Sequence, residues 1–122
     1  MSLFKDHFYS IVGTSHADAD FNFTINIDAN HAIFEGHFPG NPVTPGVVQL
    51  EMIKELLSEG LGKTVYLQSM SNCKYLAILN PNDCGEVQVS ITHTEQEGGN
   101  VKAVVVIKND QTTFLKSVGI YR

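Results

Sequence analysis

The sequence has few basic residues, few cysteines and no long apolar run. Lysine and arginine total 8 against 13 aspartate and glutamate residues, which gives a formal net charge of -5. The basic residues are scattered, whereas nucleic-acid-binding proteins present a basic stripe. The apolar runs, such as 103–107, are too short to form a membrane-spanning helix. The composition therefore predicts neither a nucleic-acid-binding protein nor a membrane protein.

The sequence also lacks a secretory signal and a metal-binding pattern. Residues 1–15 contain no basic region followed by an apolar block, so we expect no secretory signal and a cytoplasmic protein. Cys73 and Cys84 lack metal-ligand spacing, and a reduced state is favoured over a disulfide. The histidines outside 36–47 show no ligand spacing either: His7, His16, His31 and His93. No metal site is predicted.

The length and the apolar pattern predict a single domain, 1–122, with several strands. Residues 21–28 alternate strictly between apolar and polar side chains, which predicts a half-buried strand. A strand at 8–12 is expected to pair with it. The other predicted strands are 64–70, 73–79, 86–94, 101–108 and 113–121, with turns at 81–83 and 98–100.

One long helix is predicted between these strands. Thr44 is a suitable N-cap, Pro45 suits the first helical position, and the helix should reach about Glu59 before Gly60 and Gly62. Its apolar face comprises Leu50, Met52, Ile53, Leu56 and Leu57. The expected fold is α+β, with this helix packed on an antiparallel sheet of five or more strands. Because such a sheet has edges that need protection, we also expect a homodimer.

The segment 36–47 is the strongest functional candidate. It contains three prolines, three glycines and His37, and it leads directly into the helix. Proline and glycine set a backbone path, and a neutral imidazole is a competent base near pH 7. The first amides of a helix lack intrahelical acceptors, so those of Gly46 and Val47 could hold a carbonyl oxygen that gains negative charge. The alternatives are a structural histidine and an ordinary tight entry into the helix.

Glu51 is a second candidate that periodicity alone does not support. On a helical wheel it falls beside Val47, Lys54 and Glu55, opposite the apolar face, which is typical of a solvated helix surface. Glu51 becomes functional only where this surface meets a pocket or a second subunit.

The residues 34–47, Phe-Glu-Gly-His-Phe-Pro-Gly-Asn-Pro-Val-Thr-Pro-Gly-Val, resemble the signature of the 3-hydroxyacyl-acyl-carrier-protein dehydratases of the FabA/FabZ type. In that family an acidic residue follows the histidine by fourteen positions, and Glu51 lies fourteen residues after His37. A glutamate there is similar to the FabZ branch. A weaker match continues at Lys74-Tyr75 and 81–83. The resemblance implies the hot-dog fold, a long central helix wrapped by a curved antiparallel sheet.

The resemblance also implies a site and a reaction. His37 would remove the C2 proton of a 3-hydroxyacyl thioester, and Glu51 of the other subunit would protonate the departing C3 hydroxyl. The Gly46 and Val47 amides would hold the thioester carbonyl. Phe38, Pro39 and Gly40 are expected to contribute to the substrate site. The product is a trans-2-enoyl thioester, and the scheme calls for no metal or organic cofactor.

The partner implied by the resemblance is an acyl carrier protein with a phosphopantetheine-linked acyl chain. Docking to that acidic protein would need a local basic patch, for which Lys54, Lys63, Lys74 and Arg122 are candidates. The assembly would be a homodimer or a trimer of dimers. The alternatives are a hot-dog acyl thioesterase and a non-catalytic acyl-binding subunit.

One residue departs from the family pattern. Glu55 occupies a position where the family usually has glutamine, one helical turn beyond Glu51. Two nearby carboxylates favour protonation of one another. This pair is expected either to assist a general acid or to mark an altered site.

Overall fold

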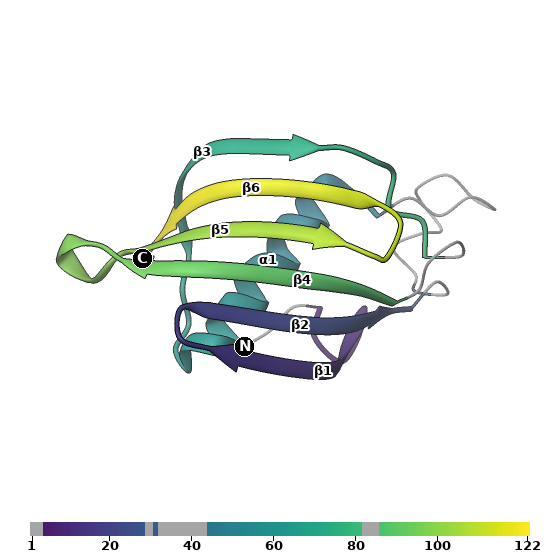
Figure 1. The fold of residues 1–122 in the computed structure, drawn as a ribbon, viewed down its shortest axis with the longest axis horizontal. Coiled ribbons are helices and arrows are strands. Elements are labelled where there is room, and N and C mark those ends of the chain that lie inside the picture. The colour runs from purple at the N-terminus through teal and green to yellow at the C-terminus, as the bar shows by residue number, and fades with distance from the viewer. Residues whose placement is uncertain (1–3, 29–30, 32–43, 82–85) are drawn as a thin grey trace.

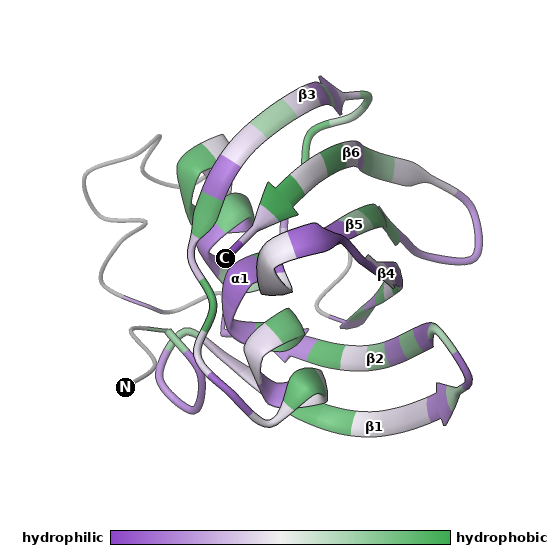
Figure 2. Cartoon of the chain, turned by 90° about the vertical axis from the view of Figure 1, so that its left-hand side faces the viewer, coloured by the Kyte–Doolittle hydropathy of each residue, from purple (hydrophilic) through white to green (hydrophobic). Residues whose placement is uncertain are grey.

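The computed structural model describes residues 4–28, 31, 44–81 and 86–122. In this part of the chain, one helix packs against a six-stranded antiparallel sheet with the order β1-β2-β4-β5-β6-β3 (Figure 1). The sheet curves around the helix, as seen end-on in Figure 2. This is the hot-dog fold, so the predicted α+β architecture is confirmed.

The first two strands form a hairpin at one edge of the sheet. β1 (Tyr9–Ala17) pairs with β2 (Asp20–Ile27), with a register shift between Ile11 and Gly13. The alternation predicted for 21–28 is confirmed, because Phe21, Phe23, Ile25 and Ile27 are all buried. β1 is longer than the predicted strand at 8–12.

Helix α1 (Gly46–Leu61) lies across the inner face of the sheet. Met52, Ile53, Leu56 and Leu57 are fully buried, and complete burial of such a side chain contributes about 1.5–3 kcal/mol. The predicted apolar face is therefore confirmed, except that Leu50 is only partly buried.

Both ends of α1 correct details of the prediction. The N-cap is Pro45, not Thr44, and it makes no side-chain capping hydrogen bond. Thr44 is instead buried, and its backbone amide donates to the Leu79 carbonyl. Gly60 does not end the helix: a Cβ there would lie 2.5 Å from the Phe21 ring, so the glycine admits close packing. Gly62 is the C-cap, with a φ of 72°.

The two strands predicted at 64–70 and 73–79 are one strand. β3 (Leu67–Tyr75) pairs with β6 (Thr113–Tyr121), and register shifts occur between Leu67 and Ser69 and between Met70 and Asn72. The second of these shifts falls at the boundary between the two predicted strands, and neither shift interrupts the pairing with β6. Residues 76–79 lie outside the strand, so that part of the prediction was wrong.

The remaining strands follow the predicted pattern closely. β4 (Glu86–Glu95) and β5 (Val101–Lys108) are joined through a short 3₁₀ turn, η2 (Glu97–Gly99). Gly98 and Gly99 have φ values of 78° and 83°, a conformation that glycine adopts without strain. The predicted hairpin at 98–100 is confirmed. Residues 82–85, and hence most of the predicted turn at 81–83, lie outside the described residues.

Candidate active site

The start of α1 borders a cavity of about 270 Å³ with a mainly apolar lining. The lining residues are Thr44, Pro45, Gly46, Gln49, Tyr75, Ala77, Ile78 and Leu79. The amides of Val48 and Gln49 donate to the Pro45 carbonyl, which begins the backbone pattern of the helix. Gly46 and Val47 precede them and occupy the positions whose amides have no intrahelical acceptor. The site therefore combines an apolar cavity with the partial positive charge of a helix start.

Tyr75 covers Gly46. A Cβ on Gly46 would lie 2.7 Å from both Cζ and Oη of Tyr75, so a side chain at this position would displace the Tyr75 ring. Burial raises the pKa of Tyr75 to about 12, and its side-chain hydrogen bond to Cys73 adds to the rise. Tyr75 therefore stays a neutral phenol near pH 7. Strand periodicity could have suggested this residue, because Cys73 and Tyr75 share one face of β3.

Two buried polar side chains lie beside the same cavity. The Nε2 amide of Gln49 donates to the Thr44 carbonyl at 3.1 Å, which fixes the orientation of the amide group. Among the described residues, Gln49 Oε1 and Thr44 Oγ1 are buried without a hydrogen-bond partner. The sequence analysis missed Gln49, although its spacing from Met52, Ile53 and Leu56 places it on the buried face of the helix.

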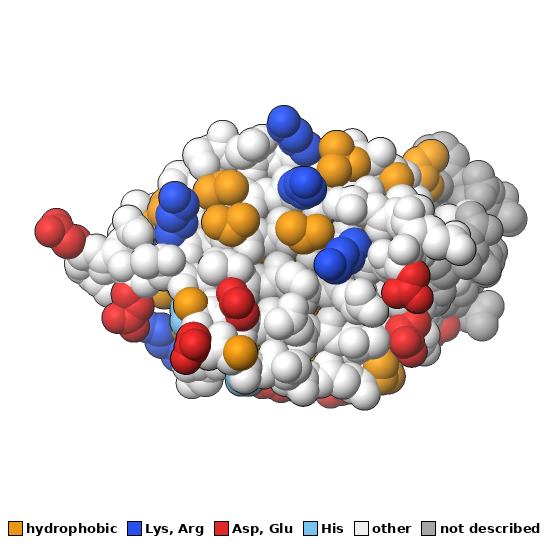
Figure 3. Space-filling model, in the orientation of Figure 1, with side chains coloured by type: hydrophobic (Ala, Val, Ile, Leu, Met, Phe, Trp, Pro, Cys, Tyr) orange, Lys and Arg blue, Asp and Glu red, His pale blue; other side chains and the backbone are white. Residues whose placement is uncertain are grey.

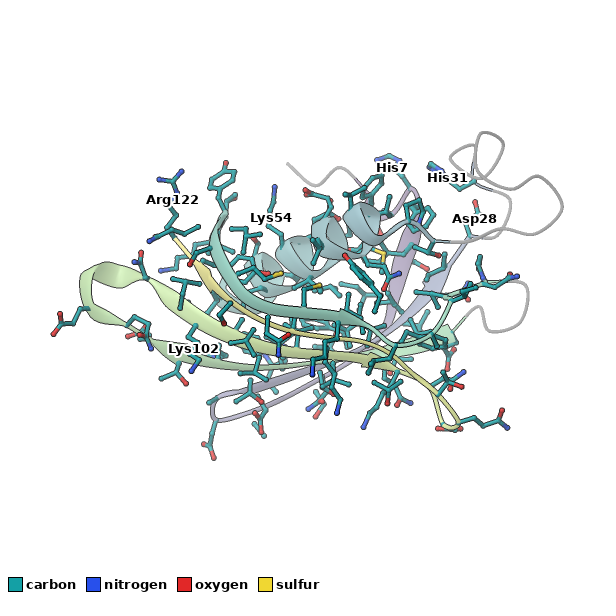
Figure 4. All side chains as sticks on the ribbon, turned by 90° about the horizontal axis from the view of Figure 1, so that it is seen from above. His7, Asp28, His31, Lys54, Lys102 and Arg122 are labelled. Carbon is teal, nitrogen blue, oxygen red and sulfur yellow. The ribbon has the colours of Figure 1, made fainter. Side chains whose placement is uncertain are left out.

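Glu51 lies on the outer side of α1 and is only partly buried. Its carboxylate Oε2 is 3.1 Å from Nζ of Lys54, and the side chains are 26% and 25% exposed. The Lys54 ammonium also lies 5.0 Å from the centre of the Tyr66 ring. Figure 4 shows Lys54 projecting from α1 away from the sheet. Glu51 lies one helical turn beyond Val47, and the ion pair with Lys54 orients its carboxylate along the outer side of α1.

Glu55 has a different environment from Glu51. It is 4% exposed and accepts hydrogen bonds of 2.9 Å from the backbone amides of Phe4 and Lys5 and from the Tyr9 hydroxyl. Lys5 also pairs with Glu59. Glu55 therefore anchors the N-terminal segment to α1. Burial and these donors favour a structural role for Glu55, and the two interpretations from the sequence, an assisted general acid and an altered site, stay predictions.

The remaining predicted site residues are not placed. His37, Phe38, Pro39 and Gly40 lie outside the described residues. The structure thus brings Gly46, Val47 and Glu51 onto one helix without testing their position relative to His37.

Comparison with known proteins identifies the family. A family model described as ApeI-like, ApeI dehydratase, matches residues 14–114. The chain belongs to the ApeI-like dehydratase family. That match covers β2, α1, β3, β4 and β5 completely and part of β1, so the residues that line the cavity and Glu51 fall within it.

Several relatives and structures are similar to this ApeI-like protein. FabZ dehydratases that act on 3-hydroxyacyl-acyl-carrier-protein are 30% identical over 93 residues in Latilactobacillus sakei and 34% identical over 89 residues in Enterococcus faecalis. The alignments cover 70% and 67% of this chain, and 66% and 63% of those proteins. The chain thus spans less than two thirds of their length.

The solved structures support the fold. The dehydratase heterocomplex ApeI:P from Xenorhabdus doucetiae matches with a TM-score of 0.76 and 20% identity, covering 91% of this chain and 95% of that chain. An uncharacterised protein from Erwinia carotovora matches with a TM-score of 0.60 and 21% identity, covering 89% and 87%.

The described residues contain no group of three or more His, Cys, Asp or Glu side chains arranged to hold a metal ion. No helix among them is both long and apolar enough to cross a membrane.

Proposed function

We propose that this chain catalyses the reversible dehydration of a 3-hydroxyacyl thioester carried by an acyl carrier protein. His37 takes the C2 proton, and the electrons of the C–H bond form the C2–C3 double bond. The C3–O bond breaks, and the hydroxyl leaves as water with a proton from Glu51. The amides of Gly46 and Val47 stabilise the charge that develops on the thioester oxygen.

The observation that carries this proposal is the arrangement of the first two turns of α1. The helix start borders an apolar cavity, and Glu51 follows Val47 by one turn on the exposed side. An acyl chain suits the apolar lining, and the thioester oxygen suits the amides of Gly46 and Val47. Membership of a dehydratase family and the resemblance of His37 and Glu51 to the FabZ pattern support the acid–base roles proposed for them.

We further propose that the site forms between two copies of the chain. β3 is an edge strand, and large apolar side chains are exposed along it and on the segments that flank it. These residues are Tyr66, Leu67, Tyr75, Leu76 and Ile78. Pairing of two β3 strands would cover them, and the proposed site would combine Glu51 of one subunit with His37 of the other. The ApeI:P structure is a heterocomplex, so a subunit of a different kind is the competing occupant of this edge.

A spectroscopic assay tests the reaction. Hydration of a crotonyl thioester removes the enoyl absorbance without releasing thiol, whereas a thioesterase releases thiol. The proposal expects loss of absorbance with no thiol. Thiol release would indicate the thioesterase, and binding without either change would indicate a non-catalytic subunit.

A further inference from the structure

The charged residues of the sheet divide between its two halves. Every charged residue of β3, β5 and β6 is a lysine, and every charged residue of β1, β2 and β4 is acidic. The lysines are Lys74, Lys102, Lys108 and Lys116, and the acidic residues are Asp20, Glu86 and Glu95. In Figure 3, which views the outer side of the sheet, basic side chains gather over the β3–β6–β5 half. We refer to this outer surface of β3, β6 and β5 as the basic face.

The four lysines of the basic face point into solvent. All are exposed, whereas their strand neighbours Ala103, Ile107 and Leu115 are buried, as alternation requires. Figure 4 shows Lys102 on the side of the sheet opposite α1. The ion pairs found between described residues join Lys5 to Glu59 and Lys54 to Glu51, and neither includes a lysine of the basic face. These charges are therefore available to an external partner.

Two of the lysines oppose each other directly. Lys74 of β3 is the register partner of Lys116 of β6, and Lys116 also faces Val106 of β5. Like charges in directly opposed positions destabilise a sheet. A chain that carries 13 acidic residues could relieve this repulsion with one of them, yet strands β3, β5 and β6 contain none. Because no ion pair between described residues offsets this repulsion, the arrangement indicates a role in binding.

The centre of the basic face is apolar. Val104 is exposed, and three further apolar side chains of β5 and β6 are partly exposed between the lysines. They are Val106, Val118 and Ile120. An apolar centre with a charged rim is the arrangement of a protein–protein interface. The chemistry fits a protein surface that combines acidic and apolar side chains.

The basic face adjoins the candidate active site at the end of β3. Lys74 and Tyr75 are its last two residues, and consecutive strand residues point to opposite faces. Lys74 thus belongs to the outer face, while Tyr75 covers Gly46 at the start of α1. A partner held at Lys74 can therefore pass a tethered group around the end of β3 to the cavity.

We propose that the basic face docks the acidic surface of the acyl carrier protein, with Lys74 and Lys116 as its principal charged contacts. This inference rests on the proposed function for the identity of the partner. Lys74 is the one basic residue of this face that the sequence analysis had already named as a docking candidate. The structure places Lys102, Lys108 and Lys116 on the same face. Complementary charge raises the association rate and depends on ionic strength.

Binding and turnover measured separately test the proposal. The double variant Lys74→Ser/Lys116→Ser is compared with Lys63→Ser/Arg122→Ser, which removes the same charge elsewhere. Calorimetric titration uses a bacterial acyl carrier protein loaded with a 3-hydroxybutyryl group, at low and physiological ionic strength. Turnover is measured on that loaded carrier and on a 3-hydroxybutyryl thioester of N-acetylcysteamine.

The expected result is an affinity for the loaded carrier about tenfold weaker in the Lys74/Lys116 variant, with a smaller salt dependence. Its turnover of the small thioester should be unchanged, and the control pair should bind like the wild type. Equal affinity in both variants, or loss only in the Lys63/Arg122 pair, would overturn the proposal. So would tighter binding of the wild type to anionic lipid vesicles than to the carrier. If the wild type turns over neither substrate, the dehydratase proposal fails, and the titration still decides the docking surface.

Discussion

The Tyr9 hydroxyl donates a hydrogen bond of 2.9 Å to Glu55, and both residues are buried. With the amides of Phe4 and Lys5, this bond fastens the N-terminal segment to the middle of α1. Glu55→Ala should lower the free energy of unfolding by about 3–5 kcal/mol, because it leaves buried donors unpaired. Glu55→Gln should cost less, since its carbonyl can still accept. Urea unfolding measures both. A loss of turnover in folded Glu55→Gln without a loss of stability would contradict the anchoring role.

Buried tyrosines should make the fold sensitive to alkali. Burial raises the pKa of Tyr121 to about 12, whereas an unfolded tyrosine titrates near about 10. The folded state therefore holds its proton more tightly, so this contribution to stability is complete below about pH 10 and is lost as the pH rises towards about 12. Burial, reinforced by Glu55, also raises the pKa of Tyr9.

The measurement for this alkaline effect is urea unfolding at a series of pH values. The contribution of Tyr121 to stability should fall by about 2–3 kcal/mol across this range. In Tyr121→Phe, the free energy of unfolding should decrease less steeply with pH. An unchanged slope in Tyr121→Phe would show that this residue does not contribute.

The contact between Tyr75 and Gly46 predicts a steric effect on the site. Gly46→Ala would place a methyl group 2.7 Å from the Tyr75 ring, and because Tyr75 is half exposed the ring can move aside. Stability should change by less than about 1 kcal/mol, since alanine favours the helix. Thioester turnover should fall severalfold as the cavity narrows. Gly46→Ala/Tyr75→Ala should recover part of that turnover; no recovery would indicate that the methyl group blocks the amide itself.

The exposed apolar residues beside β3 predict the mode of assembly. Leu76→Lys/Ile78→Lys should prevent the proposed dimer from forming, because charged side chains oppose apolar and edge contacts. Val12→Lys is the matched control, since Val12 is an exposed apolar residue of the opposite edge strand β1. Light scattering gives the masses. A monomeric wild type, or dissociation by Val12→Lys alone, would rule out assembly through β3.

The regular part of the fold was predictable because one face of each long strand is buried. Alternation located β2, β4, β5 and β6, and the helical period located the buried face of α1. β3 was divided in two because its side chains are mostly exposed, which leaves no clear alternation to follow. The predicted N-cap, Thr44, was wrong because its side chain is buried by tertiary packing. A capping rule uses local sequence only and does not include such packing.

The site was predictable only in part. Spacing and resemblance nominated Glu51, and the structure gives it a partly exposed position. The sequence could not show that Glu55 is buried while Glu51 is partly exposed. The burial of Glu55 depends on hydrogen bonds from Phe4, Lys5 and Tyr9, which are distant in sequence. The contact of Tyr75 with Gly46 joins residues from β3 and α1, so it required the fold.

The central claim is that Glu51 and His37 act together on a 3-hydroxyacyl thioester. Its most direct test is the hydration of a crotonyl thioester by the wild type, His37→Ala and Glu51→Gln, followed at the enoyl absorbance, with urea unfolding of each. The wild type should hydrate the substrate, and each variant should lose about 10²–10⁴-fold in turnover with little change in stability. Wild-type rates in both variants, or altered stability with unaltered rates, would contradict the account.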